Sequence, residues 1–331
     1  MSVWCGAASA QRAGPTNKSL FASWVSAARE KGFRIRIGRW QIHGTPTTIL
    51  IDYTPFIAKK DEIFAELWET YKVDSISAGW DFIEPTLFGY VAGQVIEDFC
   101  RYNLSPRLNV IAHFHEWMTG AGILYLQKYA PYICTMFTTH ATMVGRCIAS
   151  NNQPLYKYLQ EYSADSKAHE FNVIAKHTLE KSSAAAADVF TTVSETTAKE
   201  CKYFLGREVD LITPNGFENN FVPEDHEFQT LRQKSRQKLF QVANTLTGQN
   251  FDDETLVVVN SGRYEFRNKG IDLFIESIAR LKQKKLAKKI LALILVPAHH
   301  DGPRYDIIQR FEKPENGPLP NPFHTHNLHE F

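Results

Sequence analysis

The sequence predicts an α/β protein with parallel sheets, arranged in two units of which the second is incomplete. From residue 109 onward, short apolar runs alternate with helical segments, and this alternation is typical of parallel sheets. After residue 216 a polar, basic stretch interrupts the rhythm, which restarts near residue 251 with only two further strands. A doubly wound domain normally has about four to six strands. The second unit is therefore expected to leave apolar surface and strand edges exposed.

Composition argues against several classes of protein. Of the 331 residues, 44% are hydrophobic and 22% are charged, as in soluble globular proteins. The net charge of +1 argues against a nucleic-acid or membrane partner, and no apolar run approaches the ~20 residues of a membrane helix. The N-terminus lacks the apolar core of a secretory signal, which favours the cytoplasm. Five cysteines without a CxxC pair favour reduced thiols over disulfides or zinc.

The elements of the first unit follow from local patterns. Residues 1–18 are expected to be an unstructured lead-in, and residues 19–222 the first domain. The strands are expected at 32–40, 47–53, 109–114, 133–139, 189–193 and 209–216. Helices are expected at 61–71, 86–100 and 116–129, then as one long stretch that ends in alanines near 187, and at 194–206. Ser194 has the character of an N-cap for the last helix, and Gly206 of a residue just beyond its end.

The second domain is expected over residues 223–331, opening with a helical segment at about 226–250. Strands are predicted at 255–262 and 290–297. Between them, an apolar stripe predicts a helix that packs through one face; it comprises Ile271, Phe274, Ile275, Ile278 and Leu281. The remaining tail is rich in proline, asparagine and histidine without clear periodicity, so we expect a loop.

Polar side chains gather after the predicted strands, and ligands bind open parallel sheets at the carboxyl ends of the strands. His113 and His115 lie on the same side of an extended chain, with Glu116 directly after them. They have three interpretations: one core and one solvent-facing histidine, a metal site that lacks a third ligand, or a site for a polar substrate. The third uses both histidines in one cleft.

Three further polar residues follow other strands. His140 and Arg146 occur together after the strand at 133–139; the alternative for Arg146 is a surface salt bridge on a helix. Asn215 lies in Thr213–Gly216, which is most simply a turn. None of these residues identifies a site when taken alone.

The loop SGRYEFRNKG, residues 261–270, is the most informative stretch. One interpretation is a solvated loop of mixed charge. The other is an anion site, because a strand-to-helix turn directs backbone N–H groups and a helix dipole at one point, and Arg and Lys add charge there. The chain contains neither GxxxxGK[ST] nor GxGxxG, so a pyrophosphate held by side-chain cations, as in a nucleotide-sugar site, fits best.

Six stretches, in this order, resemble glycogen synthases of the animal and fungal type, and FASWVSAAREKGFRIRIGRW resembles their bacterial branch more closely. The six are NVIAHFHEWMTGAG, MFTTHATMVGR, ADVFTTVSETTAKE, LITPNGFENNF, HEFQTLRQKS and SGRYEFRNKGIDLFIESIARL. The resemblance implies a GT-B-like fold with two Rossmann-like domains. It implies retaining transfer of glucose from UDP-glucose to the non-reducing end of an α-1,4-glucan such as a glycogen primer, without metal or cofactor, in a homo-oligomer.

The resemblance also implies roles for particular residues. Arg263 and Lys269 match the pair that binds the donor diphosphate, and His115 matches a histidine near the donor glucose. Arg146 matches an arginine of the cleft. The residues that match binding motifs without a firm role are His113, Glu116, His140 and Asn215.

The sequence departs from the family at both ends. A glycine-rich Lys-Val-Gly-Gly loop is absent from residues 1–18, and the segment containing Glu-Pro-Trp-Gly with its two glutamates does not occur. We therefore expect a truncated form that is inactive by itself. Two alternatives remain: an ADP-glucose-dependent starch or glycogen synthase, and a non-catalytic glucan-binding or assembly fragment.

Overall fold

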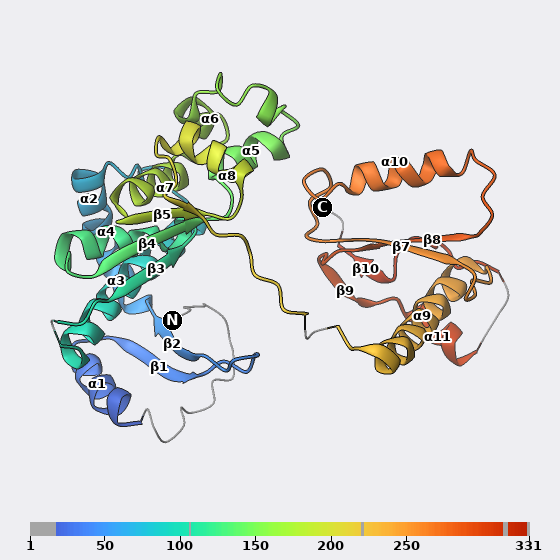
Figure 1. Cartoon of the computed structure of the whole chain (residues 1–331), viewed down its shortest axis with the longest axis horizontal. Coiled ribbons are helices and arrows are strands. Elements are labelled where there is room, and N and C mark those ends of the chain that lie inside the picture. The colour runs from blue at the N-terminus through green and yellow to red at the C-terminus, as the bar shows by residue number, and fades with distance from the viewer. Residues whose placement is uncertain (1–17, 106, 220–221, 314–316, 330–331) are drawn as a thin grey trace. The chain divides into compact units, whose positions relative to one another are not determined.

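The computed structural model describes residues 18–105, 107–219, 222–313 and 317–329. The chain divides into two units, Met1–Asn215 and Gly216–Phe331 (Figure 1). The domain limits expected from the sequence, 19–222 and 223–331, stay a prediction. Apart from Lys18, the expected lead-in lies outside the described residues.

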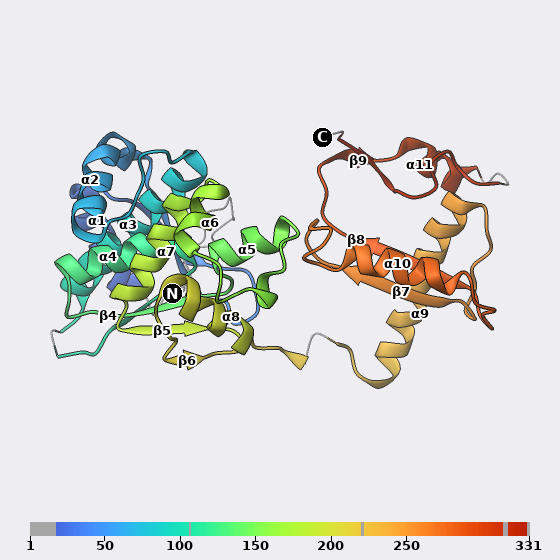
Figure 2. The same cartoon turned by 90° about the horizontal axis from the view of Figure 1, so that it is seen from above.

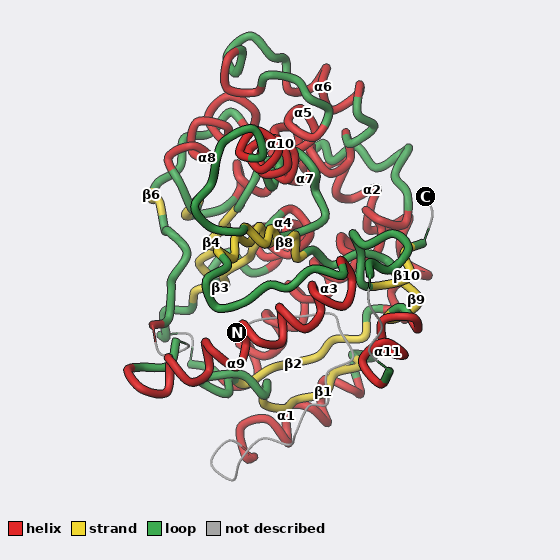
Figure 3. Tube along the Cα trace, turned by 90° about the vertical axis from the view of Figure 1, so that its right-hand side faces the viewer, coloured by secondary structure: helices red, strands yellow, loops and turns green. Residues whose placement is uncertain are grey.

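The first unit opens with a helix and a hairpin. Helix α1 (Lys18–Glu30) is followed by β1 (Arg34–Arg39) and β2 (Thr47–Asp52). The two strands, both predicted from the sequence, pair antiparallel from Arg34 opposite Asp52 to Arg39 opposite Thr47. Figure 3 shows the strands side by side. Trp24 of α1 is fully buried against this hairpin and α3.

Two helices and a short 3-10 turn follow the hairpin. They are η2 (Thr54–Lys59), α2 (Lys60–Tyr71) and α3 (Trp80–Asn103). On α2 the buried residues are Ile63, Phe64 and Leu67. Trp68 of the same helix is 45% exposed. Helix α3 begins six residues before the predicted start.

A four-stranded parallel sheet forms the centre of the first unit, in the order β3-β4-β5-β6. Its strands are β3 (Ile111–His115), β4 (Cys134–Thr139), β5 (Val189–Thr192) and β6 (Leu211–Ile212). The short helix η3 (Trp117–Thr119) and α4 (Gly120–Tyr129) connect the first two strands. The predicted parallel sheet is confirmed, and the carboxyl ends of its strands lie at one edge.

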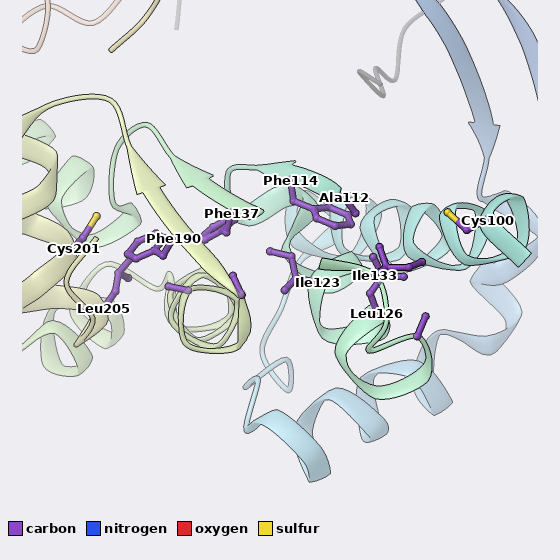
Figure 4. Close-up of a cluster of buried hydrophobic side chains, with 13 residues drawn as sticks. Cys100, Ala112, Phe114, Ile123, Leu126, Ile133, Phe137, Phe190, Cys201 and Leu205 are labelled. Carbon is purple, nitrogen blue, oxygen red and sulfur yellow. The ribbon is translucent and has the colours of Figure 1, made fainter. Parts of the chain in front are cut away.

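One face of this sheet carries the main apolar core. Phe114, Phe137 and Phe190 project from successive strands and pack against Ile123 and Leu126 of α4 (Figure 4). Ile111, at the start of β3 on the opposite face, is 68% exposed.

The long helical stretch expected before β5 is wrong: three helices occupy it. They are α5 (Met143–Ser150), α6 (Ala164–Glu170) and α7 (Ile174–Ala186), with the short η4 (Leu155–Lys157) between the first two. Asn152 and Asn172 adopt positive φ angles of 61° and 54°, which end helical runs. The hydroxyl groups of Thr142 and Ser163 cap the starts of α5 and α6, respectively.

The helix predicted at 194–206 is confirmed, with a change of type inside it. It consists of α8 (Glu195–Glu200) and the π-helical turn η5 (Cys201–Leu205). The Ser194 hydroxyl accepts a hydrogen bond from Thr197 N, and Gly206 adopts the left-handed conformation. Residues 213–218 form no turn, so the turn expected around Asn215 is wrong.

The second unit is built on two parallel strands (Figure 2). Its elements begin with α9 (Asp225–Thr247), β7 (Leu256–Ser261), α10 (Ile271–Leu281) and β8 (Ile290–Leu295). Phe240 and Ala243 of α9 pack on Leu291 of β8. Of the predicted stripe on α10 only Ile271 is buried, and Ile275 is 48% exposed. The exposed apolar surface expected for this unit is therefore present among the described residues.

The tail is not the loop that its composition suggests. It contains β9 (His300–Pro303), α11 (Tyr305–Glu312) and β10 (His326–Leu328), with β9 and β10 antiparallel. Arg304, 7% exposed, organises it: its guanidinium donates to the carbonyls of Pro320, Asn321 and His324. A polar side chain at the centre gives no apolar periodicity, which is why the sequence pattern did not predict this fold.

Candidate functional site

Parallel pairing brings the ends of β3 and β4 together. His115 lies opposite Thr138, so the residues that follow both strands are neighbours. The rings of His113 and His115 lie 4.1 Å apart between centroids, on the same side of β3, as predicted. His113 Nε2 is 2.7 Å from Thr138 Oγ1, which lies 2.6 Å from Thr191 Oγ1. A hydroxyl chain across three strands thus fixes the first histidine.

His115 and His140 form a contact between the two strand ends. His115 Nδ1 lies 3.3 Å from His140 Nε2. Although part of its side chain is exposed, burial of the ring, followed by the nearby His113 and His140, lowers the pKa of His115 to about 4. Burial also lowers the pKa of His113. Both rings are therefore neutral at pH 7 and can exchange hydrogen bonds with a polar ligand.

Glu116 has a strained backbone at this same point. Its φ of 62° and ψ of 160° fall in a region that is almost restricted to glycine. Its N–H donates to Thr138 O at 2.9 Å, and its Oε1 accepts from His140 N at 3.1 Å. Such strain is found most often at functional sites. The strain and the two bonds lock the end of β3 to the end of β4.

Arg146 lies in the first turns of α5, close behind this cluster in the chain. Its side chain is half-buried. Among the described residues, no ion pair or side-chain hydrogen bond to its guanidinium is found, so the surface salt bridge considered above has no partner there. A half-buried, uncompensated guanidinium is available to an anionic or polar ligand.

The sequence analysis did not identify two buried carboxyl groups that form hydrogen bonds with residues 139–143. Glu180 of α7 is fully buried and Glu200 of α8 is 5% exposed. Glu180 bonds Thr139 and Met143, and Glu200 bonds Thr142. For Glu180, the sequence offered one signal. It is the glutamate in the run LEKSSAAAA, where small side chains allow another element to pack closely against the helix.

In the second unit, the loop between β7 and α10 presents Arg263 and Lys269 to solvent. Arg263 Nε pairs with Glu265 Oε1 at 3.1 Å, and the Arg263 side chain is 56% exposed. The alkyl part of Lys269 lies over Gly262, where an added Cβ would meet its Cγ and Cδ at 3.4 Å. Both cations thus rest on the same short loop, with their charged ends accessible.

The N–H groups at the start of α10, which were expected to point at an anion, are already bonded within the loop. The amides of Ile271 and Asp272, at the start of α10, both donate to Phe266 O, at 3.0 and 3.3 Å. Gly270 N donates to Arg267 O at 2.9 Å. These three N–H groups are therefore not free to face a ligand, whereas the charged ends of Arg263 and Lys269 are exposed.

The residues singled out from the sequence fall in three places. His113, His115, Glu116 and His140 are joined by the contacts above, with Arg146 on the helix that follows. Arg263 and Lys269 lie together in the second unit. Asn215 is exposed at the last position of the first unit. Across 18–105, 107–219, 222–313 and 317–329, no group of three His, Cys, Asp or Glu side chains could hold a metal ion, and no helix could cross a membrane.

Comparison with known proteins settles the family. The family model described as glycogen synthase matches residues 7–307. The chain belongs to the glycogen synthase family. It is 35% identical over 291 residues to the glycogen [starch] synthase of Neurospora crassa, covering 86% of this chain. The Caenorhabditis elegans glycogen [starch] synthase is 34% identical over 295 residues, and yeast isoform 2 is 33% identical over 285 residues.

This member of the glycogen synthase family spans only part of its relatives. It covers 41% of the Neurospora protein, 44% of the C. elegans protein and 40% of the yeast protein. Among solved structures, that entitled "OtsA apo structure" matches with a TM-score of 0.40 and 12% identity, over 91% of this chain and 67% of the other.

Proposed function

We propose that this chain carries part of the donor site of a glycogen synthase. The reaction is retaining transfer of glucose from UDP-glucose to the non-reducing end of an α-1,4-glucan. The observation that carries the proposal is the cationic loop of Arg263 and Lys269 in a chain of this family. A departing UDP gains negative charge at its diphosphate, and fixed cations stabilise that charge most in the transition state.

The two cations have different parts in this proposal. Arg263, held by Glu265 at 3.1 Å in the absence of an anion, exchanges that carboxylate for phosphate oxygens, which it binds in bidentate fashion. Lys269 adds a compact charge beside it. Since the helix amides nearby are already bonded, losing either cation is expected to lower the rate by about 10²–10³-fold.

The histidine cluster binds the glucose unit of the donor. A neutral His115, with its pKa near 4, donates or accepts a hydrogen bond at a glucose hydroxyl without adding charge near the anomeric carbon. Arg146, for which no ion pair is found among the described residues, supplies a cation, and His113, Glu116 and His140 hold His115 in place. Asn215 contributes a polar contact where the chain leaves the first unit. No cofactor is part of this proposal.

We place the protein in the cytoplasm, in a homo-oligomer whose partners are UDP-glucose and a glycogen primer. Nucleic acid and membranes are not among them.

Comparing two donors tests the proposal. A full-length relative carrying these motifs should release UDP from UDP-glucose in the presence of glycogen, and an Arg-to-Ala change at the position of Arg263 should lower this rate by about 10²–10³-fold. Preference for ADP-glucose would instead favour the starch-synthase alternative. Glycogen binding by this chain, with no effect of Arg263→Ala on donor binding or turnover, would favour a glucan-binding fragment.

A further inference from the structure

A segment of eight residues carries two of the site residues and is held from behind by buried carboxyl groups. It runs from Thr139 at the end of β4 to Arg146 in α5 and includes His140. Glu180 Oε1 accepts from Thr139 Oγ1 at 2.8 Å, and its Oε2 accepts from Met143 N at 2.9 Å. Glu180 therefore ties both the strand end and the first residue of α5 to helix α7.

Glu200 holds the middle of the same segment. Its Oε2 accepts from Thr142 Oγ1 at 2.7 Å, and the same hydroxyl accepts from Gly145 N at 3.1 Å as the cap of α5. Its Oε1 accepts from Tyr156 OH at 2.8 Å. A Cβ added to Gly145 would lie 2.3 Å from Glu200 Oε2, so the helix approaches this carboxyl as closely as a glycine permits.

We propose that Glu180 is a positioning residue, which together with Glu200 fixes the 139–146 segment so that His140 and Arg146 are presented to the ligand. The proposal rests on the function proposed above only for the identity of that ligand. That the two carboxyl groups fix the 139–146 segment follows from their hydrogen bonds alone. No other polar contact with the amide of Met143 is found among the described residues.

The protonation state of Glu180 agrees with this role. Burial, and then the nearby Glu116 and Glu200, raises the pKa of Glu180 to about 8, against the lowering effect of its bonds from Met143 N and Thr139 Oγ1. Cys201 is a further ionisable group beside it, and burial, followed by Glu180 and Glu200, raises the pKa of its thiol. At pH 7 the carboxyl group is mostly neutral. In this protonated form the 2.8 Å bond can reverse, so that the carboxyl proton is donated to Thr139 Oγ1.

In the neutral form, Glu180 also helps to fix the backbone at Ala141. Thr139 Oγ1 also lies 3.3 Å from Ala141 O, to which it can donate when it accepts from Glu180. The carboxyl proton, the hydroxyl and the carbonyl then form one chain around His140. Glutamine has the same shape and can supply the same donor and acceptor, whereas methionine keeps the volume and supplies neither.

The test compares Glu180→Gln with Glu180→Met in the whole 331-residue chain without ligand. We expect Met143 amide exchange to be about tenfold faster or more in Glu180→Met, with displaced His140 imidazole resonances, and both to be unchanged in Glu180→Gln. Thr139→Val, which removes only the hydroxyl, should displace the His140 resonances if Glu180→Met does not fold. Glu97→Met is the control, because Glu97 is buried elsewhere, on Tyr125 and Arg101.

The outcomes separate this inference from the proposed function. Wild-type Met143 exchange and His140 resonances in Glu180→Met and Thr139→Val would overturn the positioning role, and so would an equal disturbance by Glu97→Met. Disruption by Glu180→Gln as large as by Glu180→Met would overturn the role of the neutral group. Failure of the wild-type chain to bind UDP-glucose would count against the proposed function alone, since the other signals need no ligand.

Discussion

His115 Nδ1 and His140 Nε2 lie 3.3 Å apart at the ends of two adjacent parallel strands. This contact joins residues that are 25 positions apart in sequence. It forms because His115 pairs with Thr138 in register, which leaves His140 just beyond the neighbouring strand end. The histidine cluster is thus a direct product of the sheet topology.

The lowered pKa of His115 makes the stability of the first unit depend on pH. The folded-state pKa of about 4 lies below the ordinary value of 6.5, so the unfolded chain binds more protons between these values. Stability should therefore fall as the pH drops from about 6.5 to about 4. When the free energy of unfolding is measured with urea between pH 4.5 and 7, it should change less with pH in His115→Gln than in the wild type. An unchanged slope would mean that this ring is not held neutral by the fold.

Gly145 should tolerate no side chain. An alanine Cβ would lie 2.3 Å from Glu200 Oε2 and 2.5 Å from Thr142 Oγ1, so the cap of α5 must shift. We expect Gly145→Ala to lower the free energy of unfolding by about 1–3 kcal/mol. Gly216→Ala is a matched control, since an added Cβ there meets no atom within 4 Å. Equal unfolding midpoints for the two variants would contradict the close approach of Glu200.

Arg304 should be essential to the tail of the second unit. It is 7% exposed and donates to three backbone carbonyls and to Asp306. Arg304→Ala leaves those acceptors unpaired, and we expect a loss of about 3–5 kcal/mol. Arg280→Ala removes only an exposed i,i+4 pair with Glu276 and should cost under ~0.5 kcal/mol. Chemical denaturation of both variants tests this, and similar losses would refute the central place of Arg304.

The sequence predicted what depends on local pattern. Alternation of apolar runs located the strands, the period of two placed His113 and His115 on one side, and Ser194 and Gly206 marked the ends of a helix. These features follow from neighbouring residues alone. The same patterns placed the polar clusters at the carboxyl ends of parallel strands, where the structure has them.

Long-range packing could not be predicted in this way. Glu180 and Glu200 are polar by type, yet both are buried because their partners lie 37 to 58 residues away in sequence. Phe266 O takes the helix amides that a strand-to-helix turn usually leaves free. In the tail of the second unit, the buried guanidinium of Arg304 occupies the centre, where apolar side chains are usual. In each case a distant or unusual partner determines whether the group is buried or bonded, and the preferences of single residues do not predict that partner.

Binding of UDP to this chain by titration calorimetry, comparing Arg263→Ala with Arg267→Ala, tests the central claim most directly. Both arginines are exposed on the same loop, but only Arg263 matches the diphosphate pair. The account predicts that Arg263→Ala weakens UDP binding by about 10–100-fold, while Arg267→Ala changes it less than about threefold. Equal weakening by both variants, or none by Arg263→Ala, would contradict a diphosphate site at Arg263.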